Sequence, residues 1–347
     1  MSDILTPFTY LHGKPQASGI MKAVPEHFIV KEVLGFEFSG QGEHFMVHVR
    51  KRGENTKYVV NELAKACGVK SRDVSWAGLK DRHAVTEQWL SVHLPGQPDP
   101  DLSEFVATHP GVEILATARH DKKLRPGDLL ANQFELVVTE LSEFEQLEER
   151  LALIAQKGVP NYFGSQRFGR QGNNVTRARA WGNDEFRVRD KSKRSFYLSA
   201  ARSWLFNMVL SQRIEQGLIE QVLDGDSLYY TDNAQYVVVN KDNQLDVDNG
   251  IAQISGPLTG DNALPTQADA AEFEQAVLDH EPLLLKVIRD NRMRHDRRAL
   301  MLHPQAMNWQ LEEQQLTLSF TLPAGCFATT VLRELIVLKD NEPTCES

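Results

Sequence analysis

One aspartate in this chain lies between two cations, an arrangement suited to nucleophilic or acid–base chemistry. Asp81 lies between Lys80 and Arg82 in the segment 78–89. Positive neighbours favour an ionised carboxylate, which an attacking group or a general base requires. Apolar residues alternate before and after the segment, so we expect a turn between strands, where catalytic side chains are common. On spacing alone, such a triplet is more often a solvated turn.

The sequence lacks the motifs of several other enzyme classes. The segment 40–42 resembles the start of a dinucleotide-binding loop but lacks the third glycine and a following helix. His44 and His48 are four residues apart, but in a strand pattern and without the glutamate of a zinc protease. No Cys-x-x-Cys pair exists, which disfavours a zinc deaminase. We therefore expect no metal and no cofactor, and we interpret His83 as a hydrogen-bonding turn residue.

Strands and one helix are expected to position the candidate aspartate. Residues 27–33 and 44–50 alternate in period two, as half-buried strands do. Residues 57–67 are predicted to form a helix, with Thr56 as its cap and Gly68 at its end. Two more strands are predicted at 112–118 and 132–139.

From about residue 143 the pattern becomes helical. A chain of 347 residues exceeds one ordinary domain, so two are expected. The order of strands, then helices, then strands favours an α+β fold with a second domain inserted in the first. Helices are predicted at 143–157, 198–214 and 268–300, a strand at 236–239, a C-terminal strand at 316–322, and a short helix at 328–337.

Charge is distributed unevenly along the chain. The net charge of −9 argues at first against an RNA partner. Residues 165–213, however, contain eleven Lys or Arg and three acids, whereas 214–285 contain fourteen acids and one Lys. Phosphate binding depends on local charge density. A second basic run, 286–298, fits RNA binding and a solvated helix face equally well. The cations expected to bind RNA are Arg187, Arg189, Lys191, Lys193 and Arg194.

Cysteine usage and the N-terminus predict a cytoplasmic protein. Cys67, Cys326 and Cys345 are odd in number and unpaired in spacing, which suits a reducing compartment. We interpret all three as buried or incidental thiols. The first residues lack the basic and apolar regions of a signal peptide, and no apolar run approaches the roughly 20 residues that span a bilayer.

Several segments resemble one enzyme family. Residues 78–89 resemble the active-site motif of the TruD-type tRNA pseudouridine synthases, in which the aspartate is catalytic. Residues 160–169 and 322–335 resemble two further signatures of that family, and 10–15, 26–32 and 193–203 also match. The resemblance therefore covers nearly the whole chain.

The resemblance implies a fold, an organisation and a reaction. The fold would be a pseudouridine-synthase catalytic domain with a mixed, mainly antiparallel sheet, formed by residues 1–157 and 304–347. A family-specific α/β domain would be inserted at 158–303. The enzyme would convert a tRNA uridine, position 13 in this family, to pseudouridine by breaking the glycosidic bond, rotating the base and rejoining it through carbon 5. Because the sequence shows no dimer seam or metal cluster, we expect it to act as a cytoplasmic monomer without a cofactor.

The resemblance also implies roles for individual residues. Asp81 would attack the uridine or abstract a proton from its ribose. Asn132 and Phe134 match the motif whose phenylalanine stacks on the flipped base, with Asn132 bonding the uracil edge or orienting the aspartate. Phe327 would be the second aromatic of the pocket. The remaining candidates are Phe28 and Glu26 on the strand that lines the site, Lys22 as the distal cation paired with Asp81, and Lys80 beside it.

Other interpretations remain open at this point. On pattern alone, the three phenylalanines fit core packing better than substrate stacking. A non-catalytic tRNA-binding chaperone of the same fold would need the basic segment 165–213 and not Asp81. An RNA glycosylase could use an aspartate to cleave the same bond and release free uracil.

Overall fold

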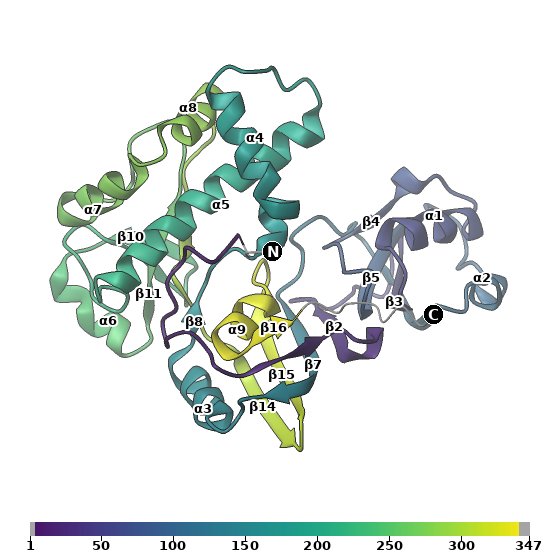
Figure 1. Cartoon of the computed structure of the whole chain (residues 1–347). Helices are drawn as coiled ribbons and strands as arrows, with labels where there is room; N and C mark the ends of the chain where they lie inside the picture. The colour runs from purple at the N-terminus through teal and green to yellow at the C-terminus, as the bar shows by residue number, and fades with distance from the viewer. Residues whose placement is uncertain (1–3, 340–347) are drawn as a thin grey trace. The chain divides into compact units, whose positions relative to one another are not determined.

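The computed structural model describes residues 4–339, which form two compact units. We call residues 15–156, 304–328 and 335–339 the sheet unit, and residues 4–14, 157–303 and 329–334 the helical unit. This division differs from the predicted domains in two segments, because 4–14 and 329–334 join the helical unit. The Glu334 carboxylate explains that grouping, since it accepts the backbone N–H groups of Leu11 and His12. Figure 1 shows the whole chain.

A mixed ten-stranded sheet organises the sheet unit (Figure 1). Its main order is β14-β15-β7-β2-β5-β3-β6, and only the β2–β5 and β1–β16 pairs among the described strands are parallel. The predicted α+β class and mainly antiparallel sheet are confirmed. The strands are β1 Ser18–Met21, β2 Phe28–Val33, β3 His44–Arg52, β4 Val74–Trp76, β5 Val85–His93, β6 Val112–His120, β7 Ala131–Ser142, β14 Gln305–Glu312, β15 Gln315–Pro323 and β16 Val337–Lys339.

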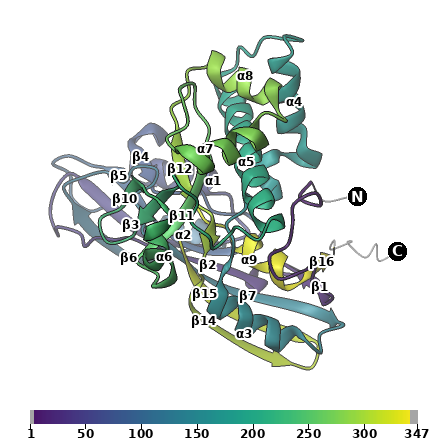
Figure 2. The same cartoon turned by 90° about the vertical axis from the view of Figure 1, so that its left-hand side faces the viewer.

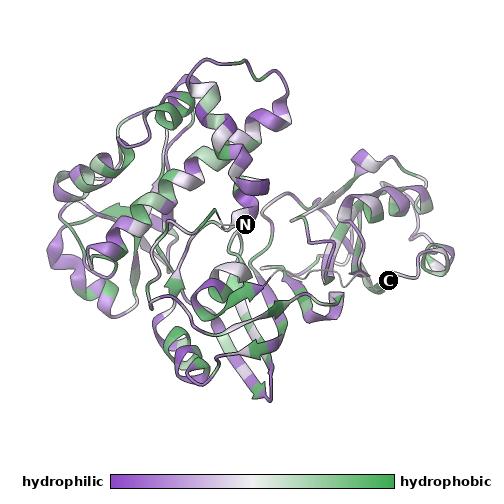
Figure 3. Ribbon diagram, viewed as in Figure 1, coloured by the Kyte–Doolittle hydropathy of each residue, from purple (hydrophilic) through white to green (hydrophobic). Residues whose placement is uncertain are grey.

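Helix α1 covers the hydrophobic core of this unit. It spans Thr56–Ala66, close to the predicted 57–67, and buries Val60 and Leu63 against the strands. The predicted cap was wrong. Asn55 caps the helix by accepting the Lys57 N–H, while the Thr56 hydroxyl donates to Gln88 Oε1 in the interior. Figure 3 shows both hydrophobic and hydrophilic stretches in the strands, and buried residues alternate with less buried ones along β2 and β15. The sheet unit also contains α2 Ser103–Thr108 and nearly all of α3 Leu147–Lys157, whereas most of α9 Ala328–Leu335 belongs to the helical unit.

Helices pack around a smaller antiparallel sheet in the helical unit (Figure 2). Helix α5 spans Lys191–Glu215 and begins seven residues before the predicted start, because Asp190 caps it by accepting the Lys193 N–H. The other helices are α4 Asn173–Gly182, α6 Gln244–Asp248, α7 Ala268–Leu278 and α8 Pro282–Asp290. The strands are β9 Ser227–Tyr230, β10 Gln235–Val238, β11 Ala252–Leu258 and β12 Asp296–Ala299, with β8 Val159–Pro160 and β13 Met301–Leu302 forming a separate pair.

The predicted helix over 268–300 was wrong at its C-terminal end. Helix α8 ends at Asp290, and β12 pairs with β11 instead. The buried Arg297 on β12 explains the change, since its guanidinium donates to Glu274 and to the Ser255 carbonyl. The strand places this arginine between partners from α7 and β11.

Of the predicted thiols, Cys67 is buried, Cys326 is half-buried, and Cys345 lies outside the described residues. None of the helices described is long and apolar enough to cross a membrane. Short 3-10 helices occur at Pro25–His27, Ser71–Asp73, Ser165–Phe168, Arg170–Gly172 and Lys241–Asn243.

Candidate active site

Asp81 lies on the loop between β4 and β5, where the sequence predicted a turn. Its side chain is 40% exposed, and its Oδ2 accepts a hydrogen bond from Lys22 Nζ at 2.8 Å. Its Oδ1 forms no hydrogen bond with any residue of the described chain. The expected ion pair between Lys22 and Asp81 is therefore present, and it leaves one carboxylate oxygen for a substrate.

Lys22 reaches Asp81 from an unusual backbone conformation. Its φ of 60° lies in the left-handed region, which costs a residue with a side chain roughly 1–2 kcal/mol. Its ammonium also lies 3.7 Å from the centre of the Phe28 ring. Strain of this kind persists where surrounding contacts enforce it, and it is common at functional sites.

The Lys80 ammonium is directed to Glu32 and Asn132. Lys80 Nζ donates to Glu32 Oε2 at 2.8 Å and to Asn132 Oδ1 at 2.9 Å. The Lys80 and Glu32 side chains are only 6% and 0% exposed. Lys80 therefore links β2 to β7, and it orients the Asn132 amide. Sequence reasoning missed Glu32, although an acid at an inward position of a period-two strand is a recognisable signal.

Two of the three predicted aromatics lie in the core. Phe28 and Phe134 are 4% and 6% exposed, and their ring centroids are 6.2 Å apart. Phe134 also packs on Phe320. Phe327 is half-buried just before α9, so it has more accessible surface for stacking. Glu26 faces solvent and accepts a hydrogen bond from Arg52, which lowers the pKa of the Glu26 carboxyl.

A buried lysine that the sequence analysis missed holds the Asp81 loop. Lys51 on β3 is 1% exposed, and its ammonium donates to the backbone carbonyls of Glu54 at 2.8 Å and Asp81 at 2.9 Å. Burial lowers the pKa of Lys51 to about 8. The alternation of β3 places this lysine on the inward face, and that was the available signal.

The depressed pKa of Lys51 predicts a specific pH dependence of stability. Its ordinary pKa is 10.5, so between pH 8 and about 10.5 the unfolded chain binds more protons than the folded one. Stability from this group therefore rises with pH across that window, by at most about 3 kcal/mol. Below pH 8 both states are protonated, and the full cost of burying the charge is present.

The contribution can be measured against a Lys51→Met variant by urea unfolding at pH 7.5, 9 and 10.5. The free energy of unfolding of the wild type, relative to the variant, should increase with pH. A Lys57→Met variant, which changes an exposed lysine on α1, should show a constant difference. A constant difference for Lys51→Met as well would contradict the assignment.

The five cations predicted to bind RNA are all exposed in the helical unit. They lie in the α4–α5 connection and the first turn of α5, where Asp190 and the 61%-exposed Phe196 accompany them. Exposed cations beside an aromatic side chain suit a nucleic-acid backbone. These are Arg187, Arg189, Lys191, Lys193 and Arg194.

Other cations of the two basic runs are used inside the unit. Arg213 is 1% exposed and forms a bidentate pair with Asp226, and Arg179 pairs with Glu281. Arg297 is buried on β12, as described above. The charge count of the sequence therefore overstates the surface available to phosphate, especially in the second run.

Three segments that resembled family signatures meet in the helical unit. The Thr330 hydroxyl donates to the Tyr162 carbonyl, and the Arg333 guanidinium lies over the Tyr10 and Tyr162 rings at 3.8 and 5.1 Å. Glu334 binds the backbone next to Tyr10, and burial raises the pKa of its carboxyl. These contacts hold the three segments together in the fold although they are far apart in the sequence.

Comparisons with known proteins identify relatives along the whole chain. The family model described as tRNA pseudouridine synthase D (TruD) matches residues 5–179 and 183–335. A tRNA pseudouridine synthase D of Photobacterium profundum is 64% identical over 340 residues, 97% of each chain. The Aliivibrio fischeri protein of that name is 56% identical and covers 100% of this chain and 99% of its own. A crystal structure from Methanosarcina mazei, assigned provisionally to the same enzyme, shares the fold with a TM-score of 0.73 at 23% identity, covering 94% of this chain and 95% of that one.

Proposed function

Because the chain belongs to the TruD family of tRNA pseudouridine synthases, we infer that it isomerises a uridine of tRNA to pseudouridine, and we propose that Asp81 acts on that uridine. The observation that carries the second part is the Asp81 side chain itself. It is half-exposed, its charge is balanced by Lys22, and its backbone is held by Lys51.

The free Oδ1 of Asp81 allows either of two first steps. It attacks C1′ of the ribose and displaces uracil, or it removes a proton from C2′ as the glycosidic bond breaks. The released uracil turns and its C5 bonds to C1′. In the first route this breaks the ester between Asp81 and C1′, and in the second Asp81 returns its proton to C2′. The C5 proton then leaves to solvent and N1 takes up one proton. No atoms are gained or lost, so the reaction needs a positioned carboxylate and binding energy.

The substrate base must leave its stack to reach this carboxylate. Flipping costs a few kcal/mol, and stacking on an aromatic side chain returns roughly 1–3 kcal/mol. We propose Phe327 as the stacking partner, since Phe28 and Phe134 are buried. Phe28 supports the Lys22 ammonium, and Asn132, oriented by Lys80, contacts the uracil edge. Glu26 contributes to the substrate-binding site through its ion pair with Arg52, and both side chains are exposed.

The proposal also covers the position of the target uridine, the residues that bind the tRNA, and the location and oligomeric state of the protein. The target is uridine 13, and Arg187, Arg189, Lys191, Lys193 and Arg194 contact the tRNA backbone. The protein acts in the cytoplasm as a monomer, without a cofactor.

The test is nucleoside chromatography of unmodified tRNA transcripts carrying uridine or cytidine at position 13. The wild type should form pseudouridine only in the first transcript. A variant with glutamate at Arg187, Arg189, Lys191 and Lys193 should lose at least about tenfold in kcat/KM, mostly through KM, because four phosphate contacts become repulsive.

The matched control reverses four exposed cations around α1: Lys57, Lys65, Lys70 and Arg72. It should retain wild-type kinetics. Bound and refolded RNA without pseudouridine would show a chaperone instead, and free uracil would show a glycosylase. Pseudouridine in both transcripts would refute the position, and equal kinetics for the two charge-reversed variants would refute the RNA-binding face.

A further inference from the structure

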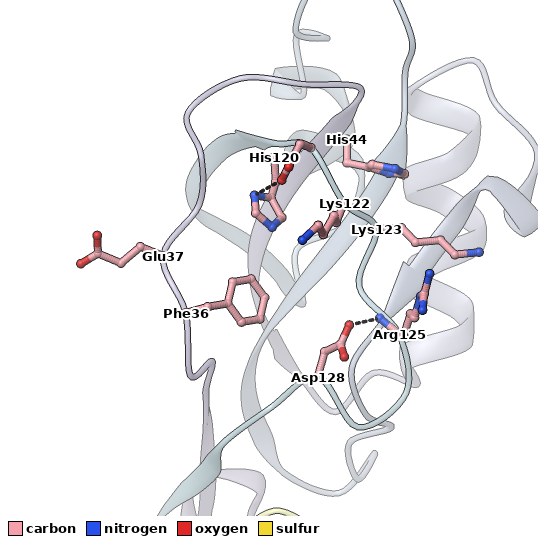
Figure 4. Close-up of a pocket in the computed structure, with 9 residues that line it drawn as sticks. Phe36, Glu37, His44, His120, Lys122, Lys123, Arg125 and Asp128 are labelled. Carbon is pink, nitrogen blue, oxygen red and sulfur yellow. Dashed lines mark hydrogen bonds and ion pairs between the residues drawn. The ribbon is translucent and has the colours of Figure 1, made fainter.

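A pocket of about 780 Å³ lies in the sheet unit beyond the ends of β2 and β7 that carry Glu32 and Asn132. Phe36 in its wall follows Glu32 by four residues, so their Cα atoms are at most about 14 Å apart. The Leu130 N–H donates to the Val33 carbonyl, and this hydrogen bond connects the end of β2 to the segment that precedes β7. The lining residues are Phe36, Glu37, His44, His120, Asp121, Lys122, Lys123, Arg125 and Asp128 (Figure 4).

One wall of the pocket is an exposed aromatic ring held in place by others. The Phe36 side chain is 40% exposed, and its ring stacks on His120 with centroids 5.5 Å apart and planes 22° apart. Phe38 packs edge-on against both rings and against Trp89. An exposed but braced ring presents a flat face to a ligand at little entropic cost.

The rest of the pocket lining contains three cations and three acids. Lys122, Lys123 and Arg125 are exposed, and none of them forms a side-chain ion pair within residues 4–339. Figure 4 shows Lys122 near the Phe36 ring, Lys123 and Arg125 across the pocket, and Glu37 pointing away.

The acids of the lining lie beside groups other than the three cationic side chains. The Asp128 carboxylate accepts the backbone N–H of Arg125, and the Asp121 carboxylate lies 3.2 Å from His120 Nδ1, which accepts the Ser39 N–H. Burial lowers the pKa of His44, so at neutral pH the lysines and the arginine supply the charge. Lys122, Lys123 and Arg125 therefore supply the donors of this pocket that a phosphate could contact.

A flat aromatic face beside flexible cations is the combination that binds a single-stranded nucleotide. We propose that this pocket is an accessory subsite for an unpaired nucleotide of the substrate RNA. Its base stacks on Phe36, and its phosphate contacts Lys122, Lys123 and Arg125. The inference rests on the proposed function, because the nearby Glu32–Lys80–Asn132 group places the subsite within a few nucleotides of the reacting uridine.

Binding of an unmodified tRNA transcript to the full-length protein tests the subsite. Phe36→Ala should raise the Kd about 5- to 150-fold, the loss of one stacked base, without changing the slope of log Kd against log salt. The double variant Lys122→Ser, Lys123→Ser should reduce that slope by about 1.4 to 1.8. In both variants kcat at saturating RNA should stay within about twofold of the wild type, since neither change touches Asp81.

The chain offers matched controls and a way to identify the nucleotide. Tyr58→Ala removes a 45%-exposed aromatic on α1, and the pair Lys57→Ser, Lys70→Ser removes two exposed lysines; both should bind as the wild type does. The effects of abasic substitutions in the RNA on the free energy of binding should add to the effect of Phe36→Ala at every position except one. That position is the nucleotide that occupies the pocket.

The outcomes separate this inference from the proposed function. Wild-type Kd and salt slope in the Phe36 and lysine variants would overturn the subsite and leave the isomerase intact. Additivity at every abasic position would overturn it as well. If Phe36→Ala weakened the binding of uridine monophosphate but left the Kd for RNA unchanged, the pocket would be a site for a free nucleotide and the subsite would be overturned. A wild type that binds RNA without forming pseudouridine would refute the function, and the binding comparison would still decide the pocket.

Discussion

Replacing Asp81 with asparagine is expected to lower the rate of pseudouridine formation by at least about 10³-fold, with RNA affinity within about threefold of the wild type. Asparagine keeps the size of the side chain and can still accept the Lys22 hydrogen bond. It can neither attack C1′ at a useful rate nor take up a proton. Single-turnover reactions with excess protein, analysed by nucleoside chromatography, measure the chemical step directly.

A Glu104→Gln variant is the control for loss of a surface carboxylate, since Glu104 is an exposed residue of α2. It should react at the wild-type rate. Isomerisation by Asp81→Asn at that same rate would remove Asp81 from the mechanism, whatever happened to RNA binding.

Replacing Lys80 with methionine is expected to destabilise the sheet unit by about 3–5 kcal/mol. The Glu32 carboxylate is fully buried, and without Lys80 the Trp89 N–H is the one donor that it keeps among residues 4–339. The Asn132 amide loses its anchor in the same variant. Pseudouridine formation should therefore also slow, by up to about 100-fold, because a misplaced binding group costs rate. Urea unfolding and single-turnover kinetics measure the two effects.

A second substitution separates stability from positioning. In the Lys80→Met, Glu32→Gln double variant the buried charge is gone, so most of the lost stability should return. The rate should stay low, because Asn132 still has no cation to orient it. Unfolding of the single variant at the wild-type urea concentration would contradict the stabilising role of the pair. Recovery of the rate along with the stability would contradict the positioning role of Lys80.

Local patterns were sufficient for much of the fold. The alternation of 27–33 and 44–50 predicted β2 and β3, and the apolar face of 57–67 predicted α1. These succeed because burial on one face imposes a period that the sequence must carry. Errors occurred where a side chain had a distant partner. Thr56 leaves the cap position to bond Gln88, and Arg297 ends the predicted helix by pairing with Glu274.

The sequence by itself determined that Asp81 would lie on a turn between strands, because the flanking alternation and the charged triplet are both local. It also indicated the family, since the matching segments extend from residue 10 to 335. Only the tertiary structure decided which charges face one another. Lys80 binds Glu32 from 48 residues away, and Lys51 reaches the Asp81 carbonyl across 30. Partners so far apart are set by sheet register and burial of the whole unit, and no local pattern of residues records them.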